Sequence, residues 1–355
     1  MSEVIRKTTP LWVNLLKYGV GLALLVGVIA MNWSGKVKDG IAEPGLKDLL
    51  ERSPNLTMLA AVGVLMVMIV FSQYVRWYYL VNALGFRFAF LDAVRLGMVG
   101  TFYNNFLPGS IGGDIVKAFS IAREQPERRT MAVCTVVADR LLGLFGLLLF
   151  GGTFGTVLWL GGNERILENG KLQVMIAGCA GAAVAGVLAY LLIGFVNENR
   201  AERIAAKLPV EALKQVWRTV WLYRQRPQTI LLGVALSAFA HTCMMLAFHF
   251  AVQVYPPADP AMLGSFAEHC TIAPIGYIIQ ALIPLPGGVG VSEFTFGGFY
   301  ELIRPNGGRV VGLTGRLALR LVEWIVGALC YIAYLNVKRT EEFTEASQPV
   351  AVGHE

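Results

Sequence analysis

Two short motifs place an acidic residue just after a glycine-rich interruption of an apolar segment. The first, NNFLPGSIGGD, covers residues 104–114, and the second, LPGGVGVSE, covers residues 285–293. Both read Leu-Pro-Gly, then Ile or Val with Gly, then an acid, which is Asp114 or Glu293. Proline removes a backbone donor and glycine admits conformations closed to other residues, so each motif should interrupt a helix. The freed amides at the start of the next helix form a potential anion site.

An arginine follows each acid at nearly the same distance, Arg140 after Asp114 and Arg320 after Glu293. Ionisable groups inside a membrane are costly and are by default functional candidates with a partner. A carboxylate at a helix start is also favoured by the helix dipole for structural reasons alone. At this point the acid and arginine pairs can be structural, can contact a substrate, or can do both.

The composition places most of the chain in lipid. Hydrophobic residues make up 55% of the 355 residues and charged residues 15%, against about 25% charged in soluble domains. A bilayer core of about 30 Å needs roughly 20 apolar residues per helix. Six unbroken stretches reach about that length: Leu11–Met31, Met58–Val81, Ala132–Leu160, Leu172–Phe195, Ile230–Val254 and Val311–Leu335. We therefore expect an all-α polytopic membrane protein with about six full spans.

Basic residues predict the orientation, because they accumulate in cytoplasmic loops. Segments 117–129 and 197–228 are basic and are expected inside, whereas segments 161–170 and 255–264 are expected outside. Both termini are then cytoplasmic, with a short tail at 341–355. Arg304 and Arg309 would fall outside, against the rule.

The two interrupted regions, Phe90–Ser120 and Phe266–Tyr300, fit this orientation only as hairpins that return to the side they entered from. They would enter from opposite faces, as in an inverted repeat covering about 58–160 and 230–335. Transporters use paired broken helices of this kind to bind substrate near the midplane. The sequence therefore predicts two opposed re-entrant hairpins.

Other ionisable or small residues have simpler explanations. His241 and His249 could share one helix face, and His269 is expected at the outer surface beside Glu268. Glu323, three residues after Arg320, is expected to stabilise helix packing. A group of glycines should allow close helix approach: Gly143, Gly146, Gly151 and Gly152. No catalytic residues, metal ligands or cofactor-binding motif are indicated, and no nucleic-acid partner is expected.

The two glycine motifs, with Ala138-Asp139-Arg140 after the first and Arg320 after the second, resemble the lysylphosphatidylglycerol synthase transmembrane region, or flippase-like domain, family. The similarity runs over about 11–338, and residues 1–340 would form one flippase-like domain. In two-domain members the membrane part is implied to move aminoacylated phospholipid while a soluble domain makes it. For this chain we expect no synthase domain. The broken-helix argument, which the resemblance supports only indirectly, assigns substrate binding or gating to the motif residues of both halves. They are Asn104, Asn105, Pro108, Gly109, Gly112, Gly113, Asp114 and Arg140 in the first half, and Pro286, Gly287, Gly288, Gly290, Glu293 and Arg320 in the second.

We expect a transporter rather than an enzyme: a lipid flippase of the cytoplasmic (inner) membrane that moves a polar-headed phospholipid or glycolipid between leaflets. One alternative is a membrane-embedded lipid-modifying enzyme with Asp114 or Glu293 as general base. Another is an accessory subunit of a separate lipid synthase or glycosyltransferase, which would then be the partner.

Overall fold

Long apolar helices form most of the chain. The computed structural model describes residues 11–38, 40–106, 112–283 and 285–347. Five helices are long and apolar enough to cross a membrane: α3 (Leu56–Ala83), α6 (Arg129–Leu160), α8 (Gly170–Gly194), α11 (Pro227–Ala251) and α14 (Gly308–Ser347) over its Gly308–Val337 part. An apolar helix, α1 (Leu11–Met31), precedes them. The predicted fold class, an all-α polytopic membrane protein, is confirmed, and the number of crossings stays a prediction.

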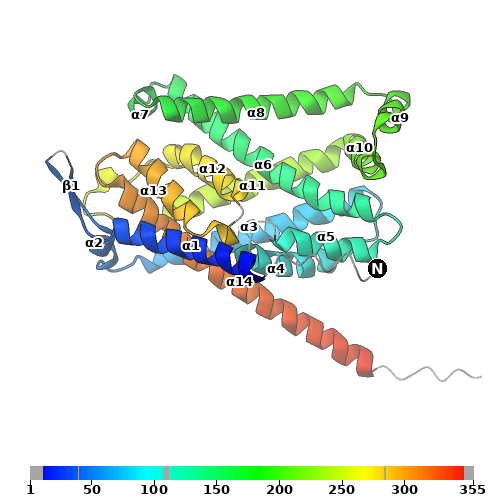
Figure 1. Cartoon of the computed structure of the whole chain (residues 1–355), viewed down its shortest axis with the longest axis horizontal. Coiled ribbons are helices and arrows are strands. Elements are labelled where there is room, and N and C mark those ends of the chain that lie inside the picture. The colour runs from blue at the N-terminus through cyan, green and yellow to red at the C-terminus, as the bar shows by residue number, and fades with distance from the viewer. Residues whose placement is uncertain (1–10, 39, 107–111, 284, 348–355) are drawn as a thin grey trace, which may run out of the picture.

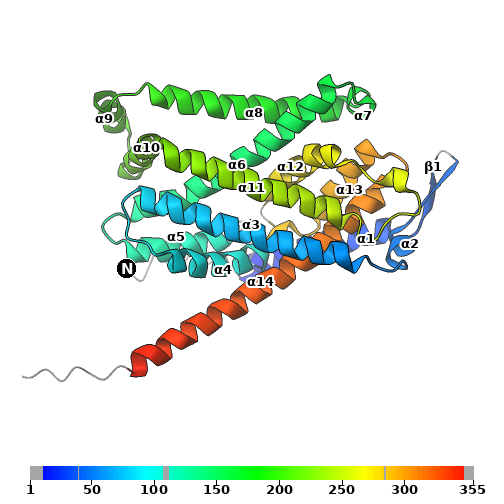
Figure 2. The same cartoon turned by 180° about the vertical axis from the view of Figure 1, so that it is seen from behind.

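Each interrupted region folds into two helices separated by its Pro-Gly break. The first contains α4 (Phe90–Phe106) and α5 (Gly112–Glu124). The second contains α12 (Phe266–Leu282), the 3-10 turn η3 (Pro286–Gly288) and α13 (Val291–Ile303). The two helix pairs lie toward opposite ends of the bundle (Figures 1 and 2). Pair α4/α5 lies toward the end that holds α9 (Glu198–Lys207) and α10 (Glu211–Arg224). Pair α12/α13 lies toward the end that holds α7 (Glu164–Leu167).

Helices α3 and α11 pack side by side in opposite directions through the middle of the bundle (Figure 2). The amide of Asn55, before α3, donates to the carbonyl of Val254, after α11, at 2.7 Å. At the other end the hydroxyl of Tyr223 in α10 donates to the carbonyl of Leu80 in α3 at 3.0 Å. These two helices therefore connect the two halves of the chain.

Small elements at the ends of the bundle were not predicted. A β-hairpin joins β1 (Lys36–Lys38) to β2 (Ile41–Glu43), and the short helix α2 (Leu46–Leu50) follows. The basic segment 197–228 is largely helical, and the indole of Trp217 in α10 donates to the carbonyl of Ala201 in α9 at 2.9 Å. That segment is therefore an ordered helical pair.

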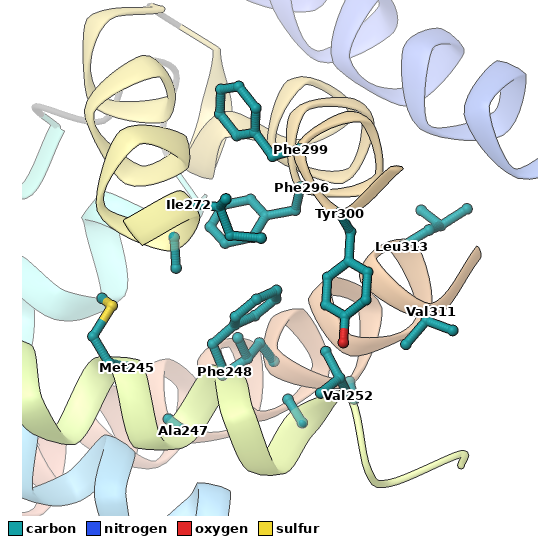
Figure 3. Close-up of a cluster of buried hydrophobic side chains, with 14 of the residues drawn as sticks. Met245, Ala247, Phe248, Val252, Ile272, Phe296, Phe299, Tyr300, Val311 and Leu313 are labelled. Carbon is teal, nitrogen blue, oxygen red and sulfur yellow. The ribbon is translucent and has the colours of Figure 1, made fainter. Parts of the chain in front are cut away.

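Aromatic side chains fill the core between α11 and the second helix pair (Figure 3). Phe248 of α11 faces Phe296 and Tyr300 of α13, with ring centroids 5.0 Å and 6.3 Å away in edge-to-face arrangements. Inside a bilayer the lipid tails are as apolar as these rings, so shape complementarity and van der Waals contact must hold the helices together. Edge-to-face ring contacts supply part of that contact.

The glycines of α6 allow close helix approach, as predicted. Gly152 lies against the backbone of α8, where a Cβ atom would come within 2.8 Å of Ala180 N and Cα. Gly146 lies against the ring of His241, and Gly151 lies against Pro274. Helix α6 thus contacts α8, α11 and α12 through small residues.

We expect Gly152→Ala to destabilise the protein by about 2 kcal/mol, because the added methyl meets backbone that can move only with α8. The matched control is Gly178→Ala in α8, where a Cβ atom would meet nothing within 4 Å. Replacing a helical glycine in open space should stabilise by up to about 1 kcal/mol. Thermal unfolding of the purified variants in detergent measures both, and equal stability of the two variants would contradict the close packing.

Candidate functional site

The second break depends on three glycines in backbone conformations that side chains rarely tolerate. Gly287, Gly288 and Gly290 have φ values of 53°, 65° and 83°. Space is also restricted, because a Cβ atom at Gly290 would lie 2.5 Å from Leu24 Cβ of α1 and one at Gly288 would lie 2.4 Å from Gln280 Cγ of α12. The predicted glycines are therefore required both for the turn and for the contact with α1.

Arg320 of α14 binds the polar groups that this break exposes. Its Nε donates to Glu293 Oε1 at 2.9 Å, and its Nη1 donates to the carbonyl of Gly287. Its Nη2 donates to Ser292 Oγ. The other carboxylate oxygen of Glu293 accepts the amide of Gly290 at 2.7 Å. Irregular backbone at membrane depth is tolerated only where protein or a watery cavity covers it, and this network is such a cover.

A second buried ion pair in α14 extends this network. The Arg316 guanidinium donates twice to the Glu323 carboxylate, at 2.9 Å and 2.8 Å, and Arg320 lies 3.5 Å from the same carboxylate. The sequence analysis expected Glu323 to pair with Arg320 alone. It missed Arg316, whose side chain is fully buried. The usable signal was the seven-residue spacing from Arg316 to Glu323, which is about two helical turns.

The first break is described on both sides of Leu107–Ile111, a segment outside the described residues that includes the predicted site residues Pro108 and Gly109. Asn104 Oδ1 accepts the amide of Gly113 at 2.9 Å, so the end of α4 caps the start of α5. Gly113 itself lies directly against the Gly100 carbonyl, where no Cβ atom would fit. Helices α4 and α5 are thus held together at their break.

Asp114 and Arg140 form the predicted ion pair of the first half. The Asp114 side chain is nearly buried, whereas 42% of the Arg140 side chain is exposed. The corresponding ion pair of the second half is inaccessible from outside the bundle, because the Arg320 side chain is 3% exposed and the Glu293 side chain is fully buried. The two halves repeat the same chemistry with different access.

Further charges beside Asp114 were missed by the sequence analysis. Arg76 of α3 donates to Asp139 Oδ1 and to Ser237 Oγ, both at 2.7 Å. Lys117, expected in a cytoplasmic loop, is instead buried on the second turn of α5, with its amine 5.0 Å from the Trp77 ring centroid. That expectation was wrong because α5 begins at Gly112 and packs Lys117 against Gly100 of α4.

The two breaks meet inside the bundle. The Asn105 side chain at the end of α4 donates to the carbonyl of Glu323 in α14 at 3.2 Å. A Cβ atom at Gly287 would lie 2.9 Å from the carbonyl oxygen of Asn105. Tyr18 of α1 also donates to the carbonyl of Phe106. The structure therefore brings Asn105 together with Gly287, Glu293 and Arg320, and leaves Asp114 and Arg140 in a second cluster.

The two histidines of α11 have different partners. His241 binds the carbonyl of Ser237, whereas Nδ1 of His249 lies 2.8 Å from Nδ1 of His269. His269 was expected at the outer surface, but it is fully buried, and its Nε2 lies 3.2 Å from the Tyr300 hydroxyl. Burial of this residue follows from its place in α12, on the side that packs against α11 and α13.

Ion pairs explain the two basic residues that opposed the charge rule. Arg304 donates to both carboxylate oxygens of Glu268, at 2.8 Å and 2.9 Å. Arg309 donates to Glu301 at 2.7 Å. Both arginines are thus neutralised at one end of the second helix pair.

An apolar groove lies between α6 and α8 and contains none of the predicted site residues. Its lining includes Leu149, Thr153, Thr156, Ala183 and Val187. The charged clusters and this groove are therefore separate features.

Comparison with known proteins agrees with an integral membrane helix bundle. Residues 15–330 match the family described as the lysylphosphatidylglycerol synthase TM region, and the chain belongs to this family. A UPF0104 membrane protein of Methanocaldococcus jannaschii is 28% identical over 98 residues, which are 27% of this chain and 29% of the relative. The match thus spans less than a third of that relative's length. No solved structure matches the chain.

We expect Glu293→Gln to cost about 3 kcal/mol of stability, because it leaves the buried Arg320 without its closest carboxylate. Asp114→Asn is the matched variant in the first half and should cost about 1 kcal/mol or less, since Arg140 is partly exposed. Unfolding of both variants in detergent measures the difference. Equal losses would contradict the difference in access between the two ion pairs.

Proposed function

We propose that this chain moves a polar-headed phospholipid or glycolipid between the leaflets of the cytoplasmic membrane. The observation that carries the proposal is the meeting of two interrupted helix pairs from opposite ends of one bundle, each with an acid and an arginine at its break. Paired broken helices of opposite orientation are how many transporters build a midplane site. A headgroup would cross between them while its acyl chains stay in the bilayer.

The distribution of basic residues supports an assignment of which end of the bundle faces the cytoplasm. Helices α9 and α10, together with the stretch from the end of α5 to the start of α6, carry a group of basic residues: Arg123, Arg128, Arg129, Arg200, Arg203, Lys207, Lys214, Arg218 and Arg224. These elements lie toward one end of the molecule (Figure 1). By the positive-inside rule that end is cytoplasmic. With α1 as a sixth span, both termini are then cytoplasmic and both helix pairs are re-entrant.

The family name supports a phospholipid as the class of substrate, because it refers to the synthase of an aminoacylated phospholipid. In this proposal the protein needs no catalytic residue and no cofactor, and a gradient or the lipid's own imbalance drives the movement. A separate enzyme that makes the lipid is the natural partner.

Reconstituted vesicles test the proposal. Wild-type protein should accelerate the movement of fluorescent phosphatidylglycerol across the bilayer, measured by the loss of signal to a membrane-impermeant quencher. Asp114→Ala and Arg320→Ala should each slow it at least about tenfold, because each variant breaks the acid–arginine pair at one of the two breaks. Arg165→Ala, in the short helix α7, should leave the rate unchanged.

Three outcomes would count against the proposal. Wild-type protein that leaves the rate at that of empty vesicles would reject lipid movement by the chain alone and favour an accessory subunit. A chemically altered lipid product would favour a lipid-modifying enzyme. Unchanged rates in folded Asp114→Ala and Arg320→Ala would reject the residue assignment.

A further inference from the structure

The charged cluster of the first half contains one more cation than anions. Arg76 pairs with Asp139 and Arg140 pairs with Asp114, and the buried Lys117 lies three residues after Asp114 on α5. Within the described part of the chain, no ion pair joins the Lys117 amine directly to either carboxylate. The segment 107–111 reads Leu-Pro-Gly-Ser-Ile and contains no ionisable residue that could balance the charge.

The second half provides the comparison. Arg316 and Arg320 face Glu293 and Glu323, so its cluster is balanced. Helix α1 also packs over this break, with Gly21 and Leu24 against Gly290. The excess of positive charge is thus a property of the first half.

The first cluster is also accessible from the side of the bundle. Arg140 is 42% exposed, and the residues around it on α5 and α6 are exposed and apolar: Ile115, Phe119, Val137 and Leu141. Arg140 lies about three helical turns, roughly 16 Å, from the start of α6. A partly exposed arginine among apolar side chains at such a position faces lipid, where an anionic headgroup would stabilise it.

We propose that Lys117 and Arg140 bind the phosphate of a lipid headgroup that enters from the bilayer between α5 and α6. Arg140 meets the phosphate at the surface, and Lys117 supplies the uncompensated charge behind it. The acyl chains lie against the exposed apolar residues of the same two helices. This assignment rests on the proposed lipid-moving function and identifies the first half as the entry site.

A charge series tests the site. Native mass spectrometry of the purified full chain, titrated with phosphatidylglycerol, measures the affinity. Lys117→Met keeps the apolar stem against Gly100 but removes the excess charge, and it should weaken binding about tenfold. Asp114→Asn adds to the excess and should tighten binding. The double variant Asp114→Asn/Lys117→Met should return to near the wild-type affinity.

Controls separate charge recognition from general damage. Diacylglycerol, which lacks the phosphate, should bind equally to all variants, and Arg165→Gln should bind both lipids as wild type does. Thermal unfolding of each variant identifies any that fail to fold, and the double variant still tests the charge rule if one single variant is unstable. A merely structural role predicts weaker binding for Asp114→Asn as well as for Lys117→Met.

The outcomes are distinguishable. Equal affinities across the series, or losses in all variants alike, would overturn the assignment. Competition by inorganic phosphate, with phosphatidylglycerol and diacylglycerol bound equally, would make the cluster a free-anion site and would also overturn it. If the protein moves lipid but its binding does not depend on these charges, only the Lys117–Arg140 site is rejected. If binding depends on the charges but no lipid moves, only the proposed function is rejected.

Discussion

The interaction between Arg320 and the second break supports the rest of the arrangement. A Pro-Gly interruption inside an apolar bundle leaves carbonyl and amide groups that lipid cannot hydrogen-bond. One guanidinium binds the Gly287 carbonyl, the Ser292 hydroxyl and the Glu293 carboxylate together, while that carboxylate accepts the Gly290 amide. Removing either charge would leave the other buried without its closest partner, which costs more than the pair contributes. Because the break is stabilised in this way, the end of α4 can pack against it and bring the two halves together.

The same motif has different surroundings in the two halves. In the second half the acid and arginine are buried, charge-balanced and covered by α1. In the first half the arginine is partly exposed beside apolar residues, and Lys117 adds a buried positive charge. In alternating access one repeat moves against the other around a fixed site, so the two halves of a transporter differ at any moment. Under the proposed function, the structure corresponds to a state that receives lipid at the first half.

The sequence predicted the helices and the paired acid and arginine residues, because these depend on local composition and on motif spacing. It did not predict the buried ion pairs between Arg76 and Asp139 and between Arg316 and Glu323. Arg76 and Asp139 lie on helices far apart in the chain, and a helix surrounded by other helices has no single polar face to reveal a partner. Lys117 was assigned to a loop because basic residues usually mark loops, whereas the start of α5 at Gly112 buries it. His269 was misplaced for a similar reason, since only the packing of α11, α12 and α13 determines its burial.

The most direct test concerns the opposed entry of the two helix pairs. Single cysteines at four exposed positions, Arg87, Glu127, Asp259 and Asn306, flank the two pairs in a chain whose native cysteines are replaced. In sealed vesicles, a membrane-impermeant thiol reagent should label Arg87→Cys and Glu127→Cys from one side, and Asp259→Cys and Asn306→Cys from the other. Labelling of Arg87→Cys and Glu127→Cys from opposite sides would mean that α4 and α5 together cross the membrane, and would contradict the opposed re-entrant arrangement.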